Sequence, residues 1–166
     1  MKRFLWVTAS ILALLFLGGG IFVSQFNLSA LPEPGPRETY LATKAKHFLV
    51  RRGSRAGIPP APSDLQASVA EGDKLFGTEC GACHGLSGNK ATDAGRWMYP
   101  RAADLTSSDA QRYSDRELFW IVKNGIRLSG MPAFGRVEPD EHIWNLVHYV
   151  RTLPSNDNPK GEETKP

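Results

Sequence analysis

The five residues Cys80-Gly81-Ala82-Cys83-His84 constrain the chain more than any other stretch. Two cysteines that are separated by two residues and followed at once by a histidine form the attachment signature of a covalently bound c-type haem. The two thiols can add across the two vinyl groups at one edge of a porphyrin, and the histidine then offers an imidazole to the iron. The chain has only two cysteines. The motif therefore predicts one haem c, linked through Cys80 and Cys83, with His84 as an axial ligand.

A redox-active dithiol and half of a tetrahedral zinc site are the alternatives for such a cysteine pair. Zinc would need a second pair of ligands, and His142 and His148 lie six residues apart, wider than the usual zinc-finger spacing. A thioredoxin-like dithiol would sit in an alternating pattern of strands and helices, which this sequence does not show. Haem attachment is therefore favoured over both.

An uncharged stretch follows Lys2 and Arg3, and its apolar part covers residues 4–23. About 20 apolar residues suffice for a helix to cross a bilayer. A signal peptide is the alternative, but its apolar region is usually shorter, and Leu28-Ser29-Ala30 is a poor small-x-small cleavage site because Leu28 is large. We expect residues 1–30 to form an uncleaved membrane anchor, with a cleaved signal and a soluble periplasmic protein as the alternative.

Residues 31–67 are predicted to be a proline-rich, basic linker. Residues 37–55 contain six basic residues and one acidic residue, whereas residues 56–166 contain 12 basic and 15 acidic residues. The main domain thus lacks the basic patch that nucleic-acid binding would need. Residues 38–52 could form a short helix. Two interpretations stay open for it: a solvated helix, or a basic amphipathic segment lying on anionic lipid or on an integral-membrane partner.

The main domain is predicted at residues 68–154. Ser68 and Glu71 fit a capping box for a helix that runs into the cysteine motif, and Ser114 and Glu117 fit another for a helix that ends at Gly125.

A last helix should open at Glu138-Pro139-Asp140-Glu141 and end at Leu153-Pro154. Residues 155–166 are a polar tail with no predicted structure.

Met131 stands between Gly130 and Pro132, in a stretch too rich in glycine and proline to be a helix or a strand. A core methionine is usually a gap-filler, but one in a glycine-flanked loop downstream of a haem motif is better explained as the second axial ligand. Residues 85–113 show no strong period and should form a loop along the haem edge. Its arginines could pair with the haem propionates, or simply be exposed. The candidate haem-pocket residues are Arg96, Trp97, Pro100, Arg101, Leu105, Pro132 and Phe134.

The haem motif, Gly130-Met131-Pro132 and the two flanking helices together resemble the class I c-type cytochromes, over about residues 68–153. They are most similar to the single-haem, membrane-anchored domains of bacterial respiratory and dehydrogenase complexes. The resemblance implies an all-α, small cytochrome c fold, with three to five short helices around one covalent haem, behind the N-terminal transmembrane helix and linker. It also implies that His84 and Met131 are the axial ligands.

Two finer expectations come from the same resemblance. The first and last helices should cross near Gly72 and Phe76, which should face Leu146 and Tyr149. Relatives commonly have a proline in the loop after the haem motif, whose carbonyl holds the histidine N–H. Pro100 is the obvious candidate here, while Ala103 stands where many relatives have proline.

The expected function is electron transfer and not catalysis, because a haem with His and Met ligands has no open position for a substrate. The chain would pass electrons between respiratory or dehydrogenase partners of unknown identity at the periplasmic face of a bacterial inner membrane. One alternative is a haem subunit of a larger membrane oxidoreductase complex. Another, if Met131 is not a ligand, is a haem protein that binds gases or peroxide.

Overall fold

A computed structural model describes residues 2–25 and 29–154. The chain divides into two compact units, Met1–Ala30 and Leu31–Pro166. The described residues form helices, turns and loops and contain no strand, which confirms the predicted all-α class. Leu28 and the predicted tail, residues 155–166, lie outside the described part.

The first unit consists of α1, Lys2–Gln25. Its apolar part, Trp6–Ser24, has 19 residues, a mean hydropathy of 2.1 and no buried residue. At 1.5 Å per residue that part is about 28 Å long, close to the ~30 Å hydrocarbon core of a bilayer. Among the described helices α1 alone is long and apolar enough to cross a membrane, as a membrane anchor or a signal sequence would be.

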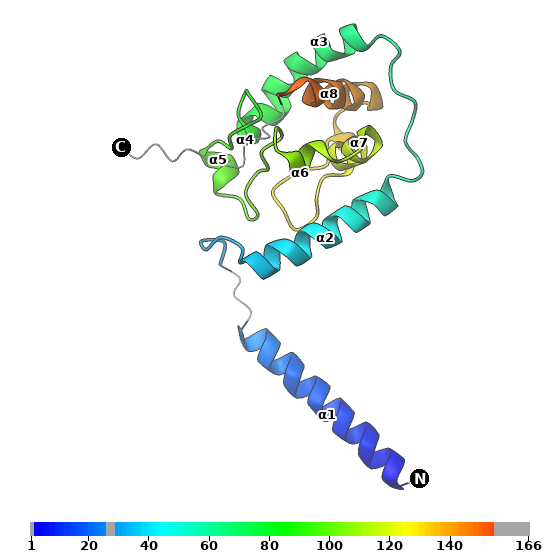
Figure 1. Cartoon of the computed structure of the whole chain (residues 1–166), viewed down its shortest axis with the longest axis vertical. Coiled ribbons are helices and arrows are strands. Elements are labelled where there is room, and N and C mark those ends of the chain that lie inside the picture. Colours follow the sequence, from blue (N-terminus) through cyan, green and yellow to red (C-terminus); the bar gives the residue numbers. More distant parts are fainter. Residues whose placement is uncertain (1, 26–28, 155–166) are drawn as a thin grey trace, which may run out of the picture. The chain divides into compact units, whose positions relative to one another are not determined.

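The second unit contains the remaining helices, drawn from cyan to red in Figure 1. In chain order these are α2 (Pro36–Gly53), α3 (Leu65–Leu75), the π-helical turn η1 (Phe76–Cys80), α4 (Gly81–His84), α5 (Asp93–Arg96), α6 (Ser108–Gln111), α7 (Asp115–Asn124), the 3-10 turn η2 (Phe134–Arg136) and α8 (Asp140–Thr152). Two short helices, α5 and α6, thus lie within the stretch that was predicted to be a loop.

The crossing of α3 and α8 is the main contact of this unit, and Figure 1 shows the two helices side by side. Gly72 permits it, because a Cβ there would lie 2.7 Å from the carbonyl carbon of Asn145 and 2.9 Å from the Cβ of Tyr149. The rings of Phe76 and Tyr149 are 5.0 Å apart. Tyr149 therefore contacts both Gly72 and Phe76, as expected. The backbone of Asn145 lies even closer to Gly72.

The start of α3 differs from the prediction. Asp64 caps the helix by accepting a hydrogen bond from the N–H of Ala67 at 3.0 Å, so α3 begins at Leu65. Ser68 was predicted to be the cap, but it is buried inside the helix. Its hydroxyl is 2.5 Å from Oδ1 of Asn145 and 2.7 Å from Nδ1 of His148. The prediction was wrong because Asp64 is an equally good cap one turn earlier, which frees Ser68 to join α3 to α8.

The predicted second capping box is present at Ser114 and Glu117, and Gly125 ends α7 with a φ of 66°. The apolar core residues that are no more than 1% exposed are Phe76, Phe119, Ile143, Leu146 and Val147, from η1, α7 and α8.

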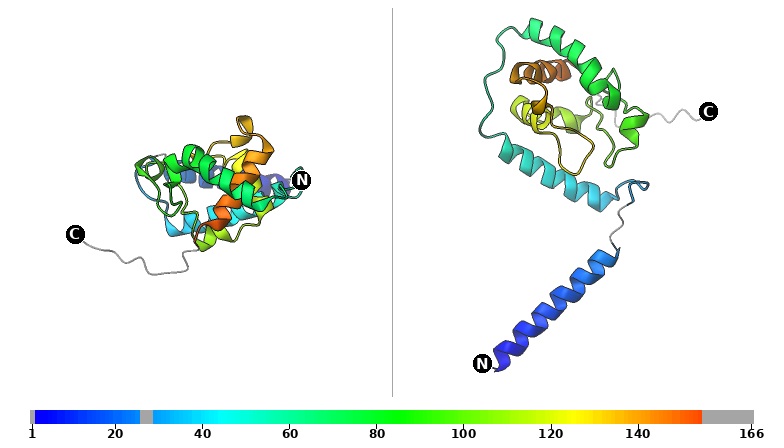
Figure 2. Two further views of the ribbon diagram at one scale, coloured as in Figure 1. Left: turned by 90° about the horizontal axis from the view of Figure 1, so that it is seen from above. Right: turned by 180° about the vertical axis from the view of Figure 1, so that it is seen from behind.

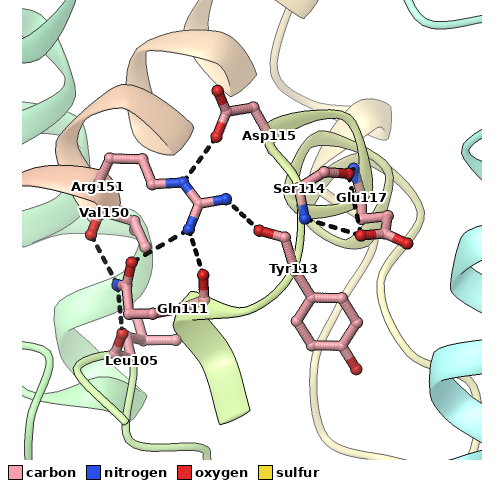
Figure 3. Close-up of polar contacts among 8 residues, drawn as sticks. All are labelled: Leu105, Gln111, Tyr113, Ser114, Asp115, Glu117, Val150 and Arg151. Carbon is pink, nitrogen blue, oxygen red and sulfur yellow. Dashed lines mark hydrogen bonds and ion pairs between the residues drawn. The ribbon is translucent and has the colours of Figure 1, made fainter. Parts of the chain in front are cut away.

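Arg151 joins the end of α8 to the turn before α7 (Figure 3). Its guanidinium donates to Oδ1 of Asp115 at 2.7 Å, to the carbonyl and side-chain oxygens of Gln111 at 2.8 and 3.1 Å, and to the carbonyl of Tyr113. The same turn carries the capping box that starts α7, so Arg151 links the end of α8 to the start of α7.

Helix α2 runs along one side of this bundle, in Figure 1 and in the right-hand view of Figure 2, and contacts α7. Val50 is 2% exposed and belongs to the core. His47 stacks on Tyr113 with 4.4 Å between ring centroids, and a Cβ at Gly53 would overlap the indole of Trp120. The segment predicted as a linker therefore contains a helix that packs on the bundle.

Candidate functional site

The cysteine motif occupies the end of η1 and all of α4. Cys80 and Cys83 are both free thiols and partly exposed. Residues three apart on a helix lie on the same face, so the two thiols can reach one planar group together. Burial, with smaller contributions from Glu79 and Cys83, raises the pKa of Cys80 to about 12. A dithiol oxidoreductase needs a thiol with a lowered pKa, so this environment disfavours that alternative.

His84 has one ring nitrogen already engaged. Its Nδ1 lies 2.8 Å from the carbonyl oxygen of Ala103, which accepts the N–H. With Nδ1 held in this way, the ring is oriented and Nε2 is the nitrogen that an iron would take. Burial lowers the pKa of His84 despite the opposing effect of this hydrogen bond, which favours the neutral imidazole that a metal needs.

The accepting carbonyl belongs to Ala103 and not to Pro100, the obvious candidate from the sequence. The reason lies in the backbone on either side of Ala103. The N–H of Ala102 donates to the carbonyl of Gly95 at 2.9 Å, and that of Leu105 to Gly88 at 2.8 Å. These bonds hold the segment that contains Ala103 against the loop that follows the motif. Because a backbone carbonyl makes the bond, alanine serves as well as proline at this position.

The loop after the motif is tied back onto α4 by Thr92. Its N–H donates to the carbonyl of Cys83 at 3.1 Å, and its hydroxyl to the carbonyl of Ala82 at 2.6 Å. Gly95 packs so closely on Cys83 that an added Cβ would be 3.0 Å from the Cys83 carbonyl carbon. The loop that contains Thr92 and Gly95 therefore packs directly on the motif.

Met131 lies in a closed turn that follows α7. Its N–H donates to Oγ of Ser129 at 3.2 Å, and its carbonyl accepts from the N–H of Ile126 at 3.3 Å. Gly125 allows the chain to form this turn, because its φ is 66° and a Cβ there would be 2.7 Å from the carbonyl oxygen of Met131. Met131 is half-buried, and its role as the second ligand stays a prediction.

Met98 was not predicted to take part in this site. Its side chain packs against Gly130, where a Cβ would be 2.8 Å from the Met98 Cγ. The loop after the motif thus meets the loop that carries Met131. A single methionine in a stretch without a period gives no signal for this contact, and only a glycine next to Met131 hints at it.

The remaining candidate pocket residues lie between the motif and α6 or between α7 and α8, with different surroundings. Arg96 pairs with Asp93, and Arg101 with Glu33. Both guanidinium groups therefore already have carboxylate partners, and their pairing with propionates stays a prediction. Leu105 packs against the core. Trp97 is 79% exposed, Pro100 and Pro132 are also exposed, and Phe134 is half-buried.

The two histidines considered for zinc are used elsewhere. Nδ1 of His142 is 2.7 Å from Oε2 of Glu138, and His148 contacts Ser68. In the part of the chain that the structure describes, no group of three or more His, Cys, Asp or Glu residues could hold a metal ion. The predicted donors are instead two neighbouring thiols, one oriented imidazole and one thioether, which are the ligand types of a covalently bound haem.

Comparison with known proteins identifies the family of the chain. The sequence profile of the family described as cytochrome C oxidase, cbb3-type, subunit III, matches residues 67–150. Cytochrome c6 of Thermosynechococcus vestitus is 30% identical over 89 residues, which cover 54% of this chain and 73% of that protein. Cytochrome c6 of Synechococcus sp. is 32% identical over 87 residues, or 51% and 69% of the two chains.

Among solved structures, a chain of the Kuenenia stuttgartiensis reducing HAO-like protein complex Kustc0457/Kustc0458 is similar, with a TM-score of 0.54 at 20% identity. The match covers 60% of this chain and 49% of that one, so it spans about half of the solved chain and shows a shared fold. The family match covers the bundle and the cysteine motif together. The chain therefore belongs to the class I c-type cytochromes, which bind haem c covalently and transfer electrons.

Proposed function

We propose that the chain is a membrane-anchored, single-haem electron carrier in which His84 and Met131 ligate the iron and Cys80 and Cys83 form the thioether links. The observation that carries this proposal is the bond of His84 Nδ1 to the Ala103 carbonyl, which leaves Nε2 for the iron. When bound, the haem supplies a one-electron iron couple. The protein's own part is to hold both ligands in place.

Each ligand is held from a different element. His84 is held by the Ala103 carbonyl, whose segment is bonded to Gly88 and Gly95 in the loop after the motif. Met131 is fixed by the turn through Ser129 and Ile126. A site closed from both sides leaves no position for a substrate, so electrons would enter and leave through the edge of the macrocycle.

Binding of carbon monoxide to the reduced holoprotein tests this ligation. We expect the wild type to bind it weakly and slowly, because Met131 would have to leave first. Met131→Ala should bind it readily, and Met98→Ala should behave like the wild type. Wild-type protein that binds carbon monoxide as readily as Met131→Ala would support the gas- or peroxide-binding alternative instead.

We also propose that α1 stays attached and holds the haem domain at the periplasmic face of a bacterial inner membrane, where it exchanges electrons with respiratory or dehydrogenase partners. The length and hydropathy of Trp6–Ser24 support this placement. The intact mass of the mature protein tests it. A mass that includes residues 1–30, with extraction by detergent but not by salt, is the expected result. A soluble protein that lacks these residues would show that they are a cleaved signal.

A further inference from the structure

Helix α2 has an inner face whose orientation the bundle fixes. Val50 is buried, and His47 stacks on Tyr113 while its Nε2 lies 3.3 Å from Oδ1 of Asp109. At the start of the helix, the hydroxyl of Tyr99 donates to Oε1 of Glu38 at 2.5 Å. These contacts hold the helix near both of its ends, so it cannot rotate to bring its other side inward.

The opposite side, which we call the outer face of α2, combines large apolar and basic residues. Tyr40, Leu41, Phe48 and Leu49 are each 56–66% exposed. Single exposed apolar side chains are ordinary, but several along one helix mark an interaction surface. The large apolar and basic residues of the outer face are Arg37, Tyr40, Leu41, Lys44, Phe48, Leu49, Arg51 and Arg52.

The charge of the outer face indicates what covers it. Apart from Glu38, which accepts a hydrogen bond from Tyr99, its charged residues are all basic. A helix with basic residues beside Phe, Leu and Tyr lies at the surface of an anionic bilayer, where its apolar side chains enter the boundary between headgroups and acyl chains. Each basic residue near such a surface raises the partition constant about fivefold.

The position of α2 in the chain supports the same occupant. Ser24 ends the apolar span and Pro36 begins α2, so 11 residues separate them. A chain of this length extends to about 40 Å at most. For this step the inference rests on the proposed anchor, which would keep α2 close to the membrane surface. Tethering raises the effective concentration of a second contact, so even weak binding becomes populated.

We infer that the outer face of α2 binds anionic lipid and lays one defined side of the haem domain on the membrane. The packed inner face transmits this orientation, because Val50, His47 and Gly53 fix α2 to the bundle. The chain would thus hold its haem at a set angle to the bilayer and not swing freely on its linker.

Hydroxyl-radical footprinting of the full-length holoprotein in nanodiscs tests the inference. One set of nanodiscs contains phosphatidylglycerol and phosphatidylcholine, and the other phosphatidylcholine alone. We expect Tyr40 and Phe48 to be oxidised several-fold more slowly in the anionic nanodiscs. Leu65, which is 58% exposed on α3, should react equally in both and serves as the internal control.

Two charge variants provide the matched comparison. Neutralising three basic residues of the outer face (Lys44→Gln, Arg51→Gln, Arg52→Gln) should weaken lipid binding by about a hundredfold and abolish the protection of Tyr40 and Phe48. Neutralising three exposed basic residues elsewhere (Lys90→Gln, Arg127→Gln, Arg136→Gln) changes the net charge equally and should leave the protection intact.

Several outcomes would overturn the inference. Equal oxidation of Tyr40 and Phe48 in both kinds of nanodisc excludes anionic lipid. Protection already present in detergent, with a doubled mass, assigns the face to a second copy of the chain. If the protein does not enter nanodiscs at all, the proposed anchor fails separately. In that case, anionic vesicles added to the soluble protein must still protect Tyr40 and Phe48, and a lack of protection refutes the lipid site.

Discussion

Gly72→Ala tests the crossing of α3 and α8, on which the position of the cysteine motif depends. The added Cβ would lie 2.7 Å from the Asn145 carbonyl carbon and 2.9 Å from the Tyr149 Cβ, and it would overlap the Asn145 carbonyl oxygen. Carbon atoms in good contact are about 3.5–4.0 Å apart. The helices would therefore have to separate by about 1 Å, because backbone atoms of α8 cannot rotate away as a side chain could.

Two effects of opposite sign set the size of the change. Alanine is better than glycine inside a helix by about 1 kcal/mol. Overpacking a core costs about 1–3 kcal/mol, and more when the obstacle cannot move. Separation of the helices also loosens the contact of Phe76 with Tyr149. We expect the cost to prevail, with a net loss of about 2 kcal/mol in the free energy of unfolding and a fall of about 10 °C in Tm.

Denaturant unfolding of the holoprotein, followed by far-UV circular dichroism and by Soret absorption, measures this loss. The midpoint should fall while the m value stays unchanged. Gly77→Ala is the matched control, because Gly77 is exposed in η1 and no atom beyond its own stretch of backbone would lie within 4 Å of its Cβ. It should leave stability unchanged or raise it slightly. The reasoning is refuted if Gly72→Ala is as stable as the wild type, or if Gly77→Ala lowers the denaturation midpoint as much as Gly72→Ala does.

Three further changes probe other parts of the molecule. Cys80→Ala or Cys83→Ala should sharply reduce the yield of covalent haem, and normal holoprotein from both variants, seen by haem staining of denaturing gels, would refute the attachment model. Val50→Ala should cost about 2 kcal/mol, from two methyl groups at about 0.8 kcal/mol each plus a small cavity, and an unchanged denaturation midpoint would show that α2 is not packed on the bundle. Arg151→Met should cost about 3 kcal/mol because it leaves the acceptors of the α6–α7 turn unpaired, and Arg151→Lys should recover only part of the loss, whereas full recovery would show that charge alone matters.

The cysteine motif, the helices and the family could be predicted because each depends on local chemistry. The capping box at Ser114 and the stop at Gly125 need only neighbouring residues, and the structure has both. The predicted start of α3 was wrong because two residues give the same local capping signal. Asp64 and Ser68 are equally good caps locally, and only the burial of Ser68 against Asn145 decides between them.

Other features could not be predicted because they depend on partners far away in the chain. The carbonyl of Ala103 carries no side-chain signal, since any residue could supply it. The contact of Met98 with Gly130 joins two loops that lack a regular period. For α2 a signal did exist: His47 and Val50 lie three residues apart on the side opposite Phe48, and this spacing is typical of a packed inner face.

The central claim is that the thioether of Met131 completes the coordination of the haem iron opposite His84. Proton NMR of the reduced holoprotein tests it directly, because a methyl group held over the porphyrin face is shifted far upfield by the ring current. The chain has three methionines, Met1, Met98 and Met131. We predict one such upfield methyl signal in the wild type and in Met98→Ala, and none in Met131→Ala. A wild type without the signal, or a signal that survives in Met131→Ala, would contradict the claim.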